Sequence, residues 1–291
     1  MIKNIILNNY LKTRCCQILI TWGWIGLFCL NVSCSEEIDW DVRESGPRMT
    51  VDGAVTNEEK IHSVQLSMSQ GLFEEKANTG ISHAMVRVHD GEQTFIFEED
   101  PENSGHYLSA DPFAGEVGKN YRLEIELPEA IDGITTLQAS ATMAHQLALD
   151  SVTVINEVFV GEEAYTVRIF GPKPTQPFNY YLIHVFRNGE KLTKDLVDLI
   201  LLDNADIEGF HVNNIPIYRS EDIGEGDVIT LEVHSLTKAY FTFLTHTISS
   251  IQGNDMMGIS GPPANAIGNL GAEVMGYFHA APIFRISRVA E

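Results

Sequence analysis

The first 33 residues limit what this chain can fold into, because they are expected to form a leader that is removed from the mature protein. Lys3, Lys12 and Arg14, with no acidic residue, precede a mostly apolar run from Ile18 to Leu30. A basic start followed by a short apolar stretch is typical of a signal peptide, and the run is shorter than the roughly 20 apolar residues of a spanning helix. We expect cleavage before Cys34, which leaves 258 of the 291 residues to fold.

Cys34 is the predicted site of lipid attachment. The small residue Ser33 precedes it, and the segment resembles a lipobox that departs from the usual pattern at Asn31, where Leu is commoner. Lipoprotein processing attaches a diacylglyceryl group to such a thiol before the leader is cut, so acyl chains such as palmitate are expected here. The competing interpretation is an uncleaved membrane anchor counted from Cys15, which Gln17 interrupts.

The segment that follows the cysteine is acidic and predicts a destination. Its polar residues are Ser35, Glu36, Glu37 and Asp39. They resemble the export signal that sends lipoproteins of Bacteroidetes to the outer face of the outer membrane, and a solvated acidic linker is the alternative. We therefore expect a lipid-anchored outer-membrane protein that faces the cell exterior, with residues 34–47 as an acidic tether.

Cysteine and charge composition exclude two further possibilities. Three of the four cysteines lie in the leader, so no intramolecular disulfide can hold the mature fold together. Three of the 19 basic residues also lie there, which leaves 16 against 40 acidic residues and a net charge of about −24. Such a surface repels the phosphates of nucleic acids, so no nucleic-acid partner is expected.

Residues 48–144 predict a first domain made of short strands. Apolar residues alternate with polar ones around Val51, Val64 and Val88, and Asp90-Gly91 is a two-residue hairpin signal. Seven or so strands in about 95 residues favour an immunoglobulin-like or transthyretin-like β-sandwich.

Residues 145–291 predict a second β-rich domain with one covering helix. Strand candidates include Tyr180 to Phe186 and Val228 to Val233, and the apolar run Leu196 to Leu202 is ambiguous between strand and helix. Residues 236–251 have helical spacing instead, with Ser235 available as N-cap. The chain is therefore predicted to be mainly β.

Three blocks of the mature chain resemble a family of Bacteroidetes lipoproteins known as domain of unknown function 4249. The blocks are residues 49–67, residues 81–123, which are also similar to transthyretin-like and carboxypeptidase-regulatory-like sandwiches, and Gly276-Tyr277-Phe278-His279-Ala280. The resemblance implies an outer-membrane lipoprotein, often encoded beside a TonB-dependent receptor. It implies no catalytic residue, because the family has no assigned activity.

A search of the residues for chemistry finds no catalytic motif and no cofactor signature. Gly258-Ile259-Ser260-Gly261 lacks the strand-turn-helix context of a nucleophile elbow. His184 and His234 are expected to approach each other within a sheet, more as core residues than as metal ligands. Acidic residues in 98–103 and 203–209 supply oxygen ligands of the kind that hold Ca²⁺, but neither segment fits the EF-hand register.

Three functional hypotheses follow. The leading one is a non-enzymatic surface lipoprotein that acts as an accessory or ligand-capturing component of a TonB-dependent transporter, with an unknown ligand. The second is a fimbrial-type structural subunit, for which Arg43 and Arg48 lie near the expected cleavage point. The third is a hydrolase of surface polymers that uses unidentified carboxylates, since two facing carboxylates suffice for glycoside hydrolysis.

Overall fold

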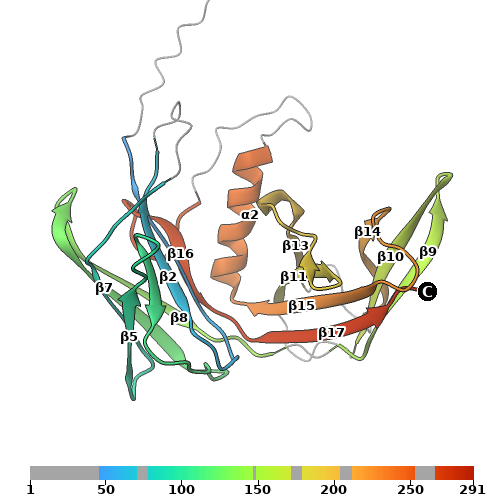
Figure 1. Ribbon diagram of the computed structural model, residues 1–291, viewed down its shortest axis with the longest axis horizontal. Coiled ribbons are helices and arrows are strands. Elements are labelled where there is room, and N and C mark those ends of the chain that lie inside the picture. Colours follow the sequence, from blue (N-terminus) through green and yellow to red (C-terminus); the bar gives the residue numbers. More distant parts are fainter. Residues whose placement is uncertain (1–45, 71–77, 147–148, 172–178, 204–211, 253–265) are drawn as a thin grey trace, which may run out of the picture. The chain divides into compact units, whose positions relative to one another are not determined.

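The computed structural model describes residues 46–70, 78–146, 149–171, 179–203, 212–252 and 266–291. These residues are mainly β with a single α-helix, which confirms the predicted fold class (Figure 1). The predicted signal peptide, Cys34 and the tether up to residue 45 lie outside the described residues. No helix in the described part of the chain is both long and apolar enough to cross a membrane.

The first sheet has nine strands and surrounds the first core. Its members are β1 (Met49–Val55), β2 (Ser63–Met68), β3 (Thr79–Gly80), β4 (Met85–His89), β5 (Thr94–Glu99), β6 (His106–Ser109), β7 (Asn120–Ile131), β8 (Ile134–Thr142) and β16 (Met275–Ala280). They are ordered β16-β1-β2-β6-β5-β4-β7-β8, and β3 pairs with β2. The outermost strands β8 and β16 contact each other, and the Asn269 side chain donates to the carbonyls of Ser140 and Phe278. The sheet therefore curls around its core.

Period-two alternation explains why this sheet has a core. In β1 the side chains of Met49, Val51 and Val55 are buried, and in β7 those of Tyr121, Leu123 and Ile125 are buried. Successive side chains of a strand point to opposite faces, so each strand contributes every second residue to the interior.

The second region combines two sheets around another core. The five-stranded sheet contains β11 (Tyr180–Arg187), β12 (Glu190–Lys191), β13 (Ile200–Asp203), β15 (Val228–Leu236) and β17 (Ile283–Val289). The three-stranded sheet contains β9 (Ser151–Phe159), β10 (Glu162–Gly171) and β14 (Val212–Ser220). Residues from both sheets, among them Val154, Val167, Ile183 and Leu231, form one buried cluster.

The apolar run that was ambiguous in the sequence contains both kinds of structure. Leu196–Asp198 form a short 3-10 helix, η1, and β13 begins two residues later at Ile200. β13 pairs with β11 along Tyr180 to Ile183. The run therefore ends as an added strand of the five-stranded sheet.

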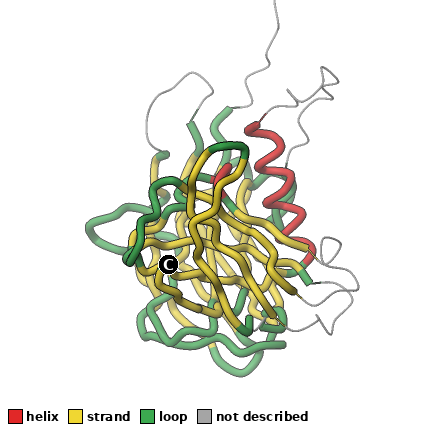
Figure 2. Tube along the Cα trace, turned by 90° about the vertical axis from the view of Figure 1, so that its right-hand side faces the viewer, coloured by secondary structure: helices red, strands yellow, loops and turns green. Residues whose placement is uncertain are grey.

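The predicted helix is present as α2 (Lys238–Gln252), although its start and its contacts differ from the expectation. Ser235, the predicted N-cap, is still part of β15, and Thr237 caps the helix by accepting the Tyr240 N–H at 3.4 Å. On one side Phe241 packs on Tyr180 of β11, and on the other Tyr240 packs on Tyr277 and His279 of β16. α2 therefore covers part of the five-stranded sheet and part of the nine-stranded sheet (Figures 1 and 2).

The last two strands connect the two regions. β16 lies within the stretch predicted as the second domain, but it pairs in parallel with β1, and only Ala281 and Pro282 separate it from β17 in the five-stranded sheet. The Asn57 side chain accepts the Ile283 N–H at 2.7 Å and donates to the Ile283 carbonyl. The end of the chain is therefore shared between both cores.

Candidate functional site

The structure does not test the predicted lipidation and export residues. Cys34, Ser35, Glu36, Glu37 and Asp39 all lie outside the described residues. Of the acidic segment 203–209 only Asp203 is described, and Gly258 to Gly261 are not described.

The acidic segment 98–103 uses its carboxylates to hold a turn. Glu99 accepts the backbone N–H of His83 at 2.8 Å and that of Gly105 at 3.1 Å, and Asp100 accepts the N–H of Glu102 at 3.0 Å. Burial raises the pKa of Glu99, but these hydrogen bonds and one from Ser82 outweigh burial and hold the pKa below its usual range. The arrangement supports the β5–β6 connection.

His184 and His234 do approach each other, with ring centroids 5.4 Å apart in an edge-on arrangement. His184 contacts the Thr193 hydroxyl and the Lys191 ammonium, and His234 Nε2 lies 2.8 Å from a Glu232 carboxylate oxygen. Burial, followed by the charges of Lys191 and His234, lowers the pKa of His184 to about 4. His184 and His234 are therefore held by neighbouring side chains as packed residues of the five-stranded sheet. Within the described ranges no group of three or more His, Cys, Asp or Glu is arranged to hold a metal ion.

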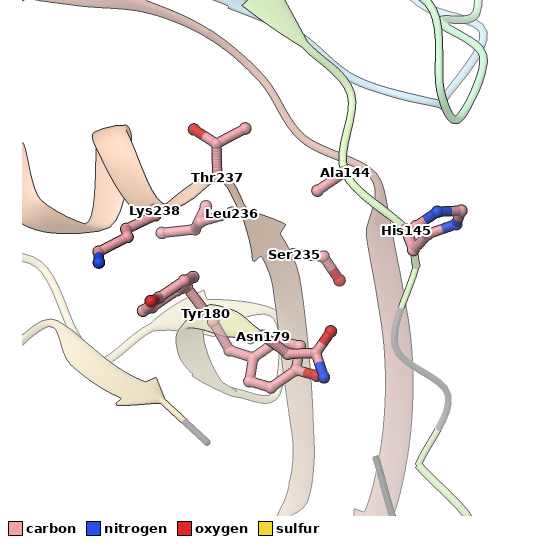
Figure 3. A pocket seen from close by; sticks show the side chains of 9 residues that line it. Ala144, His145, Asn179, Tyr180, Ser235, Leu236, Thr237 and Lys238 are labelled. Carbon is pink, nitrogen blue, oxygen red and sulfur yellow. The ribbon is translucent and has the colours of Figure 1, made fainter. Parts of the chain in front are cut away.

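A cavity of about 410 Å³ is the candidate functional site. It lies where the segment after β8, the start of β11 and the β15–α2 junction meet (Figure 3). Its lining residues are Ala144, His145, Asn179, Tyr180, Tyr181, Ser235, Leu236, Thr237 and Lys238. The volume is within the range of pockets that hold small molecules.

Two adjacent tyrosines give this cavity its apolar wall and one polar group. Tyr180 is half-buried against Phe241 of α2, with ring centroids 4.9 Å apart. Successive residues of a strand point to opposite faces of the sheet, but neither tyrosine is fully exposed to solvent here. Tyr181 is 4% exposed, and its hydroxyl has no hydrogen-bond partner among the described residues. Burial raises the pKa of Tyr181 to about 12, so the hydroxyl stays protonated and is available to a ligand.

The remaining polar groups come from the first residues of α2 and from the segment after β8. Lys238, the first helical residue, supplies an exposed ammonium group, and His145 is exposed at the cavity rim. An amide from Asn179 adds further hydrogen-bonding capacity, although it already has an interaction of its own. Aromatic surface beside donors of this kind suits a small ligand with an apolar or ring-shaped part and several oxygen acceptors.

The comparison with family models decides the membership of the chain. The model described as Domain of unknown function (DUF4249) matches residues 35–286. The chain belongs to this family. The resemblance predicted from the three sequence blocks is therefore confirmed.

Other comparisons add little to the DUF4249 assignment. A solved structure titled "Cytokine receptor complex - Crystal form 1A" aligns with 84% of this chain and 97% of its own, at 9% identity and a TM-score of 0.23, which is too low to support an argument. A search of curated proteins found no match.

The C-terminal block that resembles the DUF4249 family has a structural role beside the site. Gly276 to Ala280 lie in β16, where Phe278 and Ala280 point into the first core. Tyr277 and His279 point the other way and contact Tyr240 of α2 at ring-centroid distances of 4.9 and 4.1 Å. This DUF4249 strand therefore holds the helix whose first residues line the cavity.

Sequence reasoning placed Tyr180 and Tyr181 at the start of a predicted strand but missed the cavity. The lining residues come from three segments that lie up to 94 positions apart, from Ala144 to Lys238. Nothing in the local pattern of any one segment predicts the other two. The only local signal was the pair of large polar aromatics at the start of a strand.

Proposed function

We propose that this DUF4249 protein is a non-enzymatic outer-membrane lipoprotein that captures a small ligand at the cell surface for a TonB-dependent transporter. Attachment through Cys34 would keep it at the membrane, and the acidic residues after Cys34 favour the outer face. Family membership agrees with this proposal, since the resemblance implies lipoproteins encoded beside such receptors.

The cavity is the observation that carries the ligand-capturing part of the proposal. It offers an aromatic wall, the hydroxyl of the buried residue Tyr181 and an ammonium group at the start of a helix. The hydroxyl of Tyr181 can donate to an acceptor atom of a ligand in the cavity, and such a hydrogen bond adds to the affinity. A small molecule with several oxygen acceptors, such as a sugar or a small carboxylate, is the class that fits.

Association with the membrane and with a transporter is tested by purification of the C-terminally tagged protein from detergent-solubilised outer membranes. Intact-mass analysis is expected to show an acylated N-terminus at Cys34, and a receptor barrel is expected to co-purify. The Cys34→Ala variant is the control, and it should lose both properties. A solitary protein with an acylated N-terminus would count against the transporter, and cleavage near Arg43 or Arg48 with oligomer ladders would favour the fimbrial alternative.

Ligand capture is tested by calorimetric titration with a panel of monosaccharides, disaccharides and small carboxylates. For any ligand that binds, Tyr181→Phe should weaken binding by roughly three- to tenfold, the effect of one lost hydrogen bond. Tyr218→Phe alters a half-buried tyrosine outside the cavity and is the matched control. Equal affinities of the two variants would show that the cavity does not bind that ligand.

A further inference from the structure

The hairpin formed by β9 and β10 ends in an exposed apolar tip, which we define as Val158, Phe159 and Val160. These side chains are 66%, 67% and 87% exposed. Single apolar residues are common on protein surfaces, but a contiguous exposed group marks an interaction site more often. The core side chains of β9 are Val152 and Val154, so the hairpin continues beyond the core that it helps to build (Figure 1).

The turn at this tip contains a residue that its backbone does not favour. Val160 and Gly161 connect Phe159 to Glu162 with φ of +52° and +87°. Two-residue hairpin turns with both φ positive favour Asn-Gly or Asp-Gly, because a β-branched side chain is strained in the left-handed region.

Among the residues that the structure describes, two other turns are of the same kind, and both use the favoured residues. Asp132-Gly133 has φ of +51° and +80°, and Asn188-Gly189 has φ of +51° and +86°. Only the β9–β10 hairpin has valine at this position among these three turns. Strain that brings no packing benefit in the folded chain is a feature of functional sites.

The tip is held in place by the strands beneath it. β9 and β10 stay in register without a bulge from Ser151 to Phe159. Arg219 of β14 donates to the Glu162 carbonyl at 2.6 Å, and its guanidinium lies 5.7 Å from the centre of the Phe159 ring. A preorganised apolar projection loses little entropy on binding.

Charges around the tip indicate what kind of surface would accept it. Glu162 and Glu163 directly follow the turn and are exposed, and neither forms an ion pair within the described residues. Glu157 is already paired with Arg168 at 2.8 Å. Two free carboxylates beside three apolar side chains are complementary to an apolar pocket with Lys or Arg at its rim.

The same charges argue against two other occupants. Insertion into a membrane would bring the two carboxylates towards headgroups, which is unfavourable for a mature chain with a net charge of about −24 near anionic lipids. A second copy of this chain is disfavoured as well, because its 40 acidic residues against 16 basic ones after residue 33 would repel the two carboxylates beside the tip.

We propose that the apolar tip docks into an apolar pocket, rimmed by Lys or Arg, on a partner protein of the outer membrane. Docking would hold the lipoprotein in a fixed orientation through a surface separate from the cavity. The expectation that this partner is the transporter rests on the proposed function, whereas the chemistry of the docking surface does not.

The first test places the photo-crosslinking residue p-benzoylphenylalanine at position 160 of the full-length protein in intact cells. The same residue at position 132 is the matched control, because Asp132 occupies an equivalent turn of the β7–β8 hairpin. A cross-link at 160 and not at 132, to a peptide with apolar residues beside Lys or Arg, is expected. Equal yields at both positions, or cross-links to lipid or to this chain itself, would overturn the proposal.

The second test uses Val160→Asn, which installs the residue that the turn favours. Its thermal midpoint should equal or exceed that of the wild type, while the partner recovered from detergent-solubilised outer membranes should fall at least about tenfold, as for an interface hot spot. Glu162→Lys combined with Glu163→Lys should cause a similar loss. Unchanged recovery with these variants would refute the docking surface.

The outcomes separate this proposal from the proposed function. A transporter that co-purifies equally with wild type and Val160→Asn leaves the proposed function intact and removes the docking surface. A position-160 cross-link to a different outer-membrane protein with the stated pocket supports the docking surface and removes the transporter. The purified protein could also bind neutral phosphatidylcholine vesicles and lose this binding in Val160→Asn. That result would overturn the protein partner and show that the tip docks on a membrane.

Discussion

Gly276 lies where β16 runs in parallel beside β1, and its backbone has a φ of +94°. A Cβ atom built at this position would overlap the carbonyl oxygen of Val51. The glycine therefore satisfies two requirements at once, a left-handed backbone conformation and a close approach of two strands.

Gly276→Ala is expected to lower the free energy of unfolding by about 2–5 kcal/mol, since left-handed strain of about 1–2 kcal/mol and overpacking of about 1–3 kcal/mol add together. Gly91→Ala is the control, because Gly91 has the same φ of +94° and open space around its Cβ position. It should cost only the strain. Chemical denaturation measures both variants, and equal losses would show that the approach of Val51 is unimportant.

His279 is half-buried as a residue, but its Nδ1 atom is fully buried and has no hydrogen-bond partner. Its ring stacks on Tyr240 at 4.1 Å. Burial, helped by the charge of His234, lowers the pKa of His279 to about 3. The imidazole is therefore neutral in the folded protein throughout the physiological range.

This depressed pKa predicts a pH dependence of stability. Above pH 6.5 neither state binds the proton, so the residue has no effect, and as pH falls from 6.5 towards 3 only the unfolded chain becomes protonated. Stability should then fall by about 1.4 kcal/mol per pH unit. His184, with its pKa lowered to about 4, should add a similar slope between pH 6.5 and 4.

Denaturation curves between pH 7 and 5 test this, because most carboxylates are still ionised there. His279→Gln should reduce the slope, and His246→Gln, an exposed position on α2, should leave it unchanged. An unaltered slope in His279→Gln would contradict the depressed pKa.

At the scale of the element, α2 is stabilised by contacts on two sides. Phe241 and Leu244 face the five-stranded sheet, and Tyr240 and Phe243 face Tyr277 of β16. An apolar stripe at helical spacing predicts that a helix packs on something, but its width does not say how many surfaces it meets.

Tyr240→Ala is expected to destabilise the protein by about 3 kcal/mol, since a large aromatic side chain is lost from a packed contact. Ile251→Ala, at a 54% exposed position of the same helix, should change stability by less than about 0.5 kcal/mol. Thermal denaturation followed by circular dichroism compares the two. Similar midpoints would mean that the β16 contact contributes little.

At the scale of the molecule, the two cores depend on the same C-terminal residues. Phe278 and Ala280 complete the first core, and β17 pairs with β15 along seven residue pairs in the second. Arg285 of β17 also forms ion pairs with Glu58 after β1 and with Glu232 of β15. Removal of the last 17 residues would affect both regions.

Residues 46–146 expressed alone should therefore fail to form a native sandwich. Without β16 the edge of β1 is unpaired and the core lacks Phe278, so we expect β-type circular dichroism with poorly dispersed NMR signals. The same fragment joined by a flexible linker to residues 266–281 should recover dispersion. A well-dispersed spectrum of the shorter fragment would show that the first sheet is independent of β16.

The mainly β fold, a helix near residues 236–251 and the family could all be predicted from the amino-acid sequence. The fold class and the helix follow from local patterns, because alternation with period two or 3.6 records which face of an element is buried. The family rests instead on the resemblance of three sequence blocks and on the family match to residues 35–286. The helix start was misplaced by two residues, because Ser is the better N-cap residue but Ser235 is still paired in β15, which leaves Thr237 to cap the helix.

The contacts between distant segments could be seen only in the folded structure. β16 pairs with β1 in the first sheet, and α2 packs on the nine-stranded and the five-stranded sheets. The cavity is assembled from Ala144, Tyr181, Lys238 and their neighbours. These arrangements join residues that lie far apart in the chain. They are favoured by the burial of shared apolar surface, which produces no pattern within a short stretch of sequence. The strained Val160 became significant only when its φ could be compared with those of Asp132 and Asn188.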